Sequence, residues 1–145
     1  MLVGEFRHSL DDKSRIVLPS KFRSQLSSTV YVTLELSNCL GIYSEEEFTK
    51  LASKYTTLDD FDSTSRAVKN VFFSNTAEAS VDKQGRINIP NNLLNKVGIT
   101  KDIVLTGGFN HVNVFAKEVF ETSIKEDEAN FASNAQKIFA SKKEN

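Results

Sequence analysis

Residues 10–19 read LDDKSRIVLP, and residues 81–90 read VDKQGRINIP. Asp, Arg, Ile and Pro are identical at matching positions, and each residue lies 71 positions after its counterpart, as Asp82 does after Asp11. A repeat at this spacing indicates one supersecondary unit used twice. Two copies are too few for a solenoid, which needs three or more. We therefore expect two halves that close on each other around a pseudo-twofold axis.

The similarity continues beyond the prolines with one inserted residue. Residues 31–33 (YVT) align with residues 103–105 (IVL), and residues 40–43 (LGIY) align with residues 112–115 (VNVF). Alternating aliphatic residues and turn signals then predict the same order in each half: two strands, a helix, two strands and a helix. The expected strands are 3–10, 15–18, 30–36, 39–43, 76–82, 86–89, 102–106 and 112–115.

Capping signals place the expected helices. Pro19 and Pro90 are predicted at the first helical position of helices 20–26 and 91–97, with Gly98 after the second as its C′ residue. The Ser44-x-x-Glu47 capping box opens a further helix. Apolar spacing predicts a helix over 63–75 and one long helix after residue 115, carrying Phe120, Ile124, Phe131 and Ile138 on one face.

These elements divide the chain into a first half (1–62), a connecting helix (63–75), a second half (76–120) and a C-terminal helical tail (121–145), with the halves merging into one unit. The fold class is mixed α/β. A chain of 145 residues that is 39% hydrophobic and 26% charged suits a soluble globular protein. The single cysteine fits a reducing compartment, and no secretory or membrane-spanning pattern is evident, so we expect a cytoplasmic protein.

The net charge of −1 is unevenly distributed. Residues 1–25 carry a net charge of +2 and residues 81–101 carry +3, whereas residues 45–62 carry −4. The repeated stretches are therefore basic and the segment between them is acidic, which is compatible with a local nucleic-acid footprint.

Signatures of enzymes are missing from the sequence. It contains neither a phosphate-cradling glycine-rich loop nor a nucleophile elbow. His8 and His111 lie at non-equivalent repeat positions, and two histidines with one cysteine are too few for a typical zinc site. Cys39 lies in an aliphatic strand, where a small buried hydrophobe is the better interpretation than a nucleophile. We expect no enzyme activity, no metal and no cofactor.

Arg15 and Arg86 are the strongest functional candidates. Each opens a strand after a tight turn, close to Lys13 or Lys83. One interpretation is structural: each arginine pairs with Asp11 or Asp82 across its own turn. The other is that both turns present a guanidinium on the same face, where it reads guanine or clamps phosphate. The two interpretations are compatible if each aspartate orients its arginine.

The sequence resembles the MraZ family, within the wider AbrB-like group of DNA-binding barrels. The resemblance rests on GEFRHSLDDKSR (4–15), LPSKFR (18–23) and VDKQGRINIP (81–90), and it extends over roughly residues 1–125. It implies a swapped-hairpin barrel, a ring-shaped homo-oligomer and a nucleoid-associated transcriptional regulator of double-stranded DNA. The implied target is a set of promoter repeats ahead of the division and cell-wall gene cluster, including its own gene. The implied DNA-binding residues are Arg15, Arg86, Lys13 and Lys83, with the turns oriented by Asp11, Asp82 and Gly85.

One turn position departs from the family pattern, because Ser14 stands where glycine is usual and where the second half has Gly85. Either the two turns share a positive φ at this position, or the first turn has a different shape with Ser14 at negative φ. A rival function of another class also stays open. In it, the chain is a structural or protein-interaction module whose basic turns meet an acidic partner.

Overall fold

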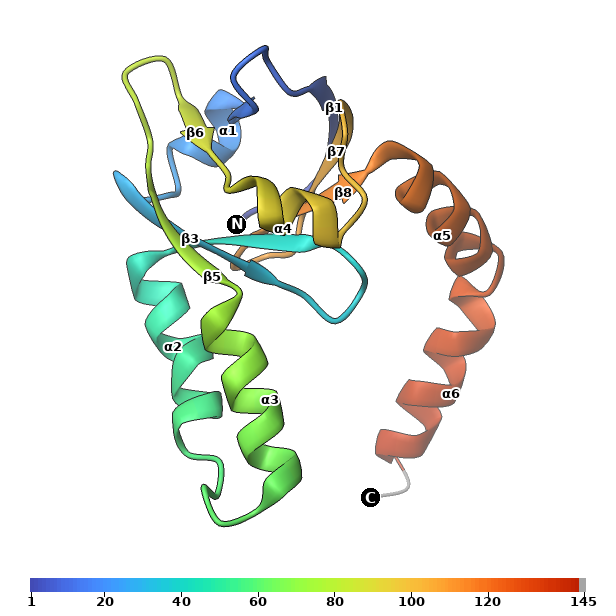
Figure 1. Ribbon diagram of the computed structural model, residues 1–145. Helices are drawn as coiled ribbons and strands as arrows, with labels where there is room; N and C mark the ends of the chain where they lie inside the picture. The colour runs from blue at the N-terminus through green and yellow to red at the C-terminus, as the bar shows by residue number, and fades with distance from the viewer. Residues whose placement is uncertain (144–145) are drawn as a thin grey trace.

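The computed structural model describes residues 1–143, and its helices and strands follow the repeat (Figure 1). The last two residues of the expected tail, 144 and 145, lie outside the described part. The first half holds β1 (Glu5–Ser9), β2 (Arg15–Val17), α1 (Ser20–Arg23), β3 (Thr29–Leu34), β4 (Leu40–Ser44) and α2 (Glu45–Thr56). After α3 (Ser63–Ser74), the second half holds β5 (Thr76–Ser80), β6 (Arg86–Asn88), α4 (Asn91–Lys96), β7 (Asp102–Gly107), β8 (Val112–Ala116) and α5 (Lys117–Ala129), and α6 (Phe131–Lys143) follows.

The strands pair across the two halves. The larger sheet is antiparallel with the order β1-β7-β8-β4-β3-β5, and β2 pairs with β6 in a separate two-stranded ribbon. Replacing each strand by its counterpart in the other half gives the same order read from the opposite edge, as the expected pseudo-twofold symmetry requires. Each half lends its first strand to the other half, as a swapped hairpin does. The structure shows two sheets rather than the expected closed barrel, because β1 and β5 are edge strands and β2 and β6 pair only with each other.

The strand register corrects the sequence alignment by one residue in β3 and β7. His8 faces Ile103, and the equivalent Ala79 faces Val30, so Val30 corresponds to Ile103 at a spacing of 73 rather than 72. Burial explains this register, because it places Val30 in the core in the same way as Ile103. The pairing of β4 with β8 confirms the alignment of residues 40–42 with residues 112–114.

Apolar residues of both halves fill one core between the large sheet, the β2–β6 ribbon and the short helices. Ile16 and Ile87, at the centres of β2 and β6, are fully buried and face each other. Pro19 and Pro90 precede α1 and α4 as N-cap residues with extended backbone, one position earlier than predicted. Gly98 follows α4 at a φ of +73°, which confirms it at the C′ position.

The helices outside the core differ between the halves. The α2 and α3 helices form an antiparallel pair below the sheet, and the rings of Tyr55 and Phe72 stack between them with centroids 3.7 Å apart (Figure 1). The predicted single tail helix is wrong: it breaks at Asn130 into α5 and α6, which form an arm on the other side. Asparagine is a poor residue for a helix interior because its side chain competes for backbone hydrogen bonds.

Candidate nucleic-acid interface

Asp11 organises the first turn, between β1 and β2. One of its carboxylate oxygens accepts hydrogen bonds from the backbone N–H groups of Lys13 (2.9 Å) and Arg15 (2.8 Å). The other oxygen accepts a hydrogen bond from Nε of Arg15 at 2.7 Å. The backbone N–H of Ser14 donates to the Asp11 carbonyl at 3.0 Å. The aspartate thus closes the turn and fixes the arginine that follows it.

Asp82 builds the second turn, between β5 and β6, with the same contacts. Its carboxylate accepts from the backbone N–H groups of Gln84 (2.9 Å) and Arg86 (2.8 Å) and from Nε of Arg86 (2.7 Å). The N–H of Gly85 donates to the Asp82 carbonyl at 3.0 Å. The Asp–Arg ion pair of the structural interpretation therefore exists in both turns.

The two turns share the left-handed backbone conformation that favours glycine. Ser14 has a φ of +57° and Gly85 has a φ of +78°. Of the two alternatives for the first turn, the structure shows the matched one. Ser14 adopts a conformation that costs a residue with a Cβ about 1–2 kcal/mol.

Backbone hydrogen bonds hold the pKa of both aspartates below its ordinary value of 3.8. The largest cause for Asp11 is the N–H of Arg15, and the largest cause for Asp82 is the N–H of Arg86. The guanidinium of the same arginine lowers the pKa further in each turn. Both carboxylates are therefore ionised at neutral pH and keep their arginines oriented.

The β2–β6 ribbon places both arginines on one outer face. Arg15 lies opposite Asn88, and Val17 lies opposite Arg86. Because the residues between them, Ile16 and Ile87, point into the core, these four side chains point outward. The arginines lie diagonally across the ribbon, each with its Nε held by an aspartate. In the second turn, Nη2 of Arg86 also donates to Oε1 of Gln84 at 3.3 Å.

Two outward-facing side chains of this ribbon were missed by the sequence interpretation. Val17, 42% exposed, and Asn88, also exposed, occupy equivalent repeat positions between the arginines. The available signal was their period-two spacing from the buried isoleucines. An asparagine amide is suited to adenine, and valine methyls are suited to the methyl group of thymine.

The other cationic residues of the two turns are less symmetric than Arg15 and Arg86. Lys13 corresponds to Gln84 in the repeat, and Lys83 corresponds to Asp12, so the two lysines occupy different positions in their turns. Arg23 adds to the asymmetry, because it crosses from the first half to the second turn and donates from Nη2 to the Lys83 carbonyl at 2.7 Å. The second turn therefore gathers three cations around one aspartate, whereas the first has two cations and two aspartates.

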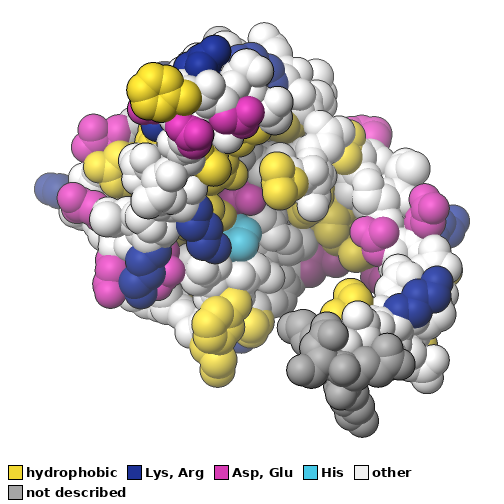
Figure 2. Space-filling view, turned by 90° about the horizontal axis from the view of Figure 1, so that it is seen from below, with side chains coloured by type: hydrophobic (Ala, Val, Ile, Leu, Met, Phe, Trp, Pro, Cys, Tyr) yellow, Lys and Arg dark blue, Asp and Glu magenta, His cyan; other side chains and the backbone are white. Residues whose placement is uncertain are grey.

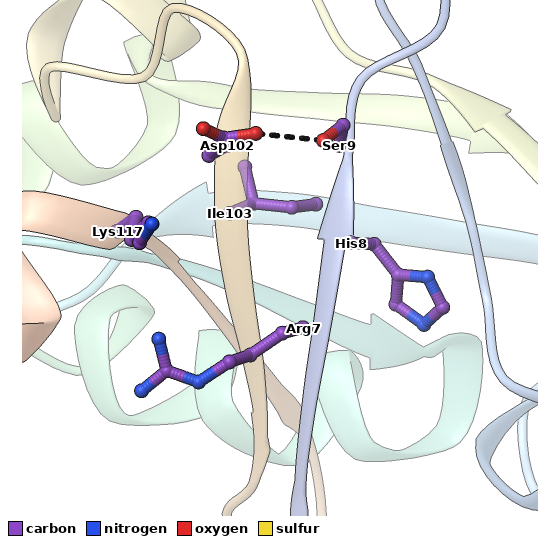
Figure 3. Close-up of a pocket in the computed structure, with 6 residues that line it drawn as sticks. All are labelled: Arg7, His8, Ser9, Asp102, Ile103 and Lys117. Atoms are coloured by element: carbon purple, nitrogen blue, oxygen red, sulfur yellow. Dashed lines mark hydrogen bonds between the residues drawn. The ribbon is translucent and has the colours of Figure 1, made fainter.

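A polar hollow beside β1 is the alternative location for a site (Figure 3). In Figure 3 the side chains of Arg7 and Lys117 lie on one side of the strands and His8 points to the other. The Arg7 guanidinium bonds Glu121 at 3.0 Å and Glu5 at 3.2 Å, and Ser9 donates to Asp102 at 2.7 Å. Since most of these charges are satisfied within the protein, the hollow is a weaker candidate than the ribbon.

Other chemistry finds little support in the described residues. Cys39 is buried, as expected, and burial raises the pKa of its thiol to about 12, so the thiolate is scarce at neutral pH. Within residues 1–143, no three His, Cys, Asp or Glu side chains gather closely enough to hold a metal ion. No helix in that range is long and apolar enough to cross a membrane.

Comparison with known proteins agrees with the repeat. The family model described as MraZ protein matches twice, over residues 1–71 and 72–141. Proteins named "Transcriptional regulator MraZ" are 37% identical in Natranaerobius thermophilus, 40% in Acetivibrio thermocellus and 36% in Caldanaerobacter subterraneus subsp. tengcongensis. Each alignment covers 138 residues, which is 95% of this chain and 96% of the relative.

Proposed function

This chain belongs to the MraZ family, and from that premise we propose that it is a transcriptional regulator that binds double-stranded DNA sequence-specifically. The DNA-contacting surface is the outer face of the β2–β6 ribbon together with its two turns. The observation that carries the proposal is the pair of matched turns, each fixing one arginine through an aspartate on the same face.

The size of the ribbon suits the major groove. Each strand has three residues, which span about 10 Å at roughly 3.4 Å per residue. The major groove of B-DNA is about 12 Å wide and admits a two-stranded ribbon. Arg15 and Arg86 then reach guanine edges or phosphates, while Val17 and Asn88 lie between them, toward the bases.

The fixed arginines favour recognition over simple charge attraction. An arginine held by its Nε loses less side-chain freedom on binding than a free one, and its two Nη groups retain the fork geometry that matches guanine. Lys13 and Lys83, on the exposed turns, supply charge to neighbouring phosphates. Arg23 adds a further positive charge for phosphates beside the second turn.

Assembly explains how a protein with a net charge of −1 binds a polyanion. We propose that the chain forms a ring-shaped homo-oligomer and that several copies engage promoter repeats at once, so that weak single footprints add up through multivalency. The proposed repeats lie ahead of the division and cell-wall gene cluster that includes its own gene. The proposed location is the cytoplasm, in association with the nucleoid.

Titration of fluorescent duplexes with the protein at several salt concentrations tests this function. One duplex carries the region upstream of the protein's own gene, and a second has the same composition in scrambled order. The proposal predicts tighter binding to the first duplex and a linear fall of log K with log salt, as counterion release requires. If the protein binds neither duplex, the proposal is overturned, and the rival function, a protein-interaction module whose basic turns contact an acidic partner, is favoured.

A further inference from the structure

The α3 and α6 helices hold matching places in the two family repeats but have different surroundings. Each follows the second helix of its repeat, and residues 71–74 (VFFS) resemble residues 138–141 (IFAS). In α3, Phe72 is buried and its ring stacks on the rings of Phe48 and Tyr55 of α2. In α6, the matching Phe139 is 63% exposed.

The connection to the preceding helix explains this difference. Six residues, 57–62, separate α2 from α3 and allow the chain to reverse, whereas Asn130 alone separates α5 from α6. In addition, the α5 residue that corresponds to Tyr55 is Asp127, which offers no ring for stacking. As a result α6 leads away from the body of the protein (Figure 1), and its apolar face stays open.

That face is continuous along the helix. Phe131, Ala135, Ile138 and Phe139 follow helical spacing and line one shallow hollow, whose remaining lining residues are Asp127 of α5 and Asn134. The three large apolar side chains are each more than half exposed. Isolated exposed apolar residues are ordinary, but a row of this kind on a projecting helix indicates a contact surface.

A second apolar surface lies on the first half. A groove of about 410 Å³ runs between α3 and the turn that joins β3 to β4, and its most exposed apolar residues are Leu36 (96%), Val71 (55%) and Val68 (45%). Its lining residues all come from the range 34–72, so α6 of the same chain does not line it. Figure 2 shows hydrophobic side chains on the body and on the arm, with a hollow between them.

We propose that α6 of one copy docks in this groove of a second copy, where it acts as a third helix beside α2 and α3. The charges are compatible: Glu35, which also accepts a hydrogen bond from the Tyr43 hydroxyl, is the one charged residue that lines the groove, whereas Lys137 is the one charged residue of α6 over residues 131–141. The contact joins two different surfaces, so each copy offers one helix and one groove. Such a heterologous contact propagates from copy to copy and closes into a ring when the rotation permits. The proposal rests on the homo-oligomer of the proposed function and names the surfaces that form it.

Two substitutions, one on each surface, test this contact by light scattering without DNA. Val68→Asp damages the groove and leaves α6 intact, and Ile138→Asp damages α6 and leaves the groove intact. Leu36→Asp is a second groove variant on a turn outside the helices, and Phe61→Asp is the matched control, since Phe61 is 95% exposed and lines neither surface. We expect the wild type and the control to form a discrete species several times the 16.2 kDa chain mass, and the other variants to be monomers.

Mixing the two damaged chains gives the sharpest result. The Val68→Asp chain still has a helix to give and the Ile138→Asp chain still has a groove to receive it, so the mixture should form a dimer of twice 16.2 kDa and nothing larger. A wild type that is monomeric overturns the proposal, because α6 then stays free or folds onto its own chain. Full assembly of either groove variant overturns it too, since the contact would then join helix to helix. Because these readouts need no DNA, failure of DNA binding in the wild-type oligomer counts against the proposed function alone.

Discussion

Two single variants, Ser14→Gly and Gly85→Ser, test whether the two turns share one backbone conformation. At a φ of +57°, Ser14 has a left-handed conformation that costs about 1–2 kcal/mol relative to glycine. Relief of this strain is partly offset, because glycine gives the unfolded chain more conformational freedom and thereby lowers the free energy of unfolding by roughly 0.5–1 kcal/mol. We therefore expect Ser14→Gly to stabilise the protein by about 0.5–1 kcal/mol.

The reverse change should cost more. A Cβ on Gly85 would lie 3.0 Å from Cδ and 3.1 Å from Nη1 of Arg23, so that side chain must move and its hydrogen bond to the Lys83 carbonyl weakens. With the backbone strain included, we expect Gly85→Ser to destabilise the protein by about 1–2 kcal/mol.

Thermal melts of the two single variants measure these effects. For a chain of this length, 1 kcal/mol shifts the melting temperature by about 2–4 °C. The melting temperature should rise by about 1–4 °C for Ser14→Gly and fall by about 2–8 °C for Gly85→Ser. A fall in both variants would mean that Ser14 gains more from its turn than its backbone conformation costs, which is the opposite of what we expect.

Three further outcomes follow from the two turns and from the buried cysteine. Asp82→Asn should lower the free energy of unfolding at pH 7, as measured in denaturant titrations. The difference from wild type should shrink as the pH falls below 3.8, because a carboxylate with a lowered pKa stabilises the fold only while it is ionised. A constant difference down to pH 2 would contradict this. Cys39 should react with a thiol reagent at pH 8 only as fast as the protein unfolds, because its thiol is buried with a pKa of about 12; rapid native labelling would show otherwise. Arg23→Ala should weaken duplex binding in an anisotropy titration more than Arg7→Ala does, since Arg23 lies on the second turn; equal effects would remove Arg23 from the interface.

The repeat made much of the fold predictable. Alternating aliphatic residues around the two Asp–Arg turns predicted the strands, and the equivalence of the halves predicted a pseudo-twofold arrangement with both arginines on one face. The correspondence of β3 with β7 was missed by one residue, because the second half has two extra residues before β7 and one fewer after it, and only the burial of Val30 and Ile103 distinguishes the alignments. The break at Asn130 was missed because apolar spacing continues through it on both sides.

The candidate site was predictable where the repeat preserves it and unpredictable elsewhere. Arg15 and Arg86 are equivalent, so one pattern found both. Arg23 has Leu94 as its counterpart, so the repeat gives no signal for it, and its contact with the second turn arises only when the halves interleave. Val17 and Asn88 are equivalent in position but differ in chemistry, so the repeat gave no signal for this pair either.

Duplex binding by the Arg15→Ala/Arg86→Ala double variant, with Arg7→Ala as the control, shows whether the two arginines of the ribbon contact DNA. Arg7 is exposed and paired with Glu5 and Glu121 on β1, away from the ribbon. We expect the double variant to fold but to bind the upstream duplex weakly. Its slope of log K against log salt should be shallower by roughly 0.9 for each lost phosphate contact. Where an arginine reads a base instead, discrimination at that base pair should fall by about 1–3 kcal/mol. Unchanged affinity, salt slope and specificity in the double variant would mean that Arg15 and Arg86 do not contact DNA.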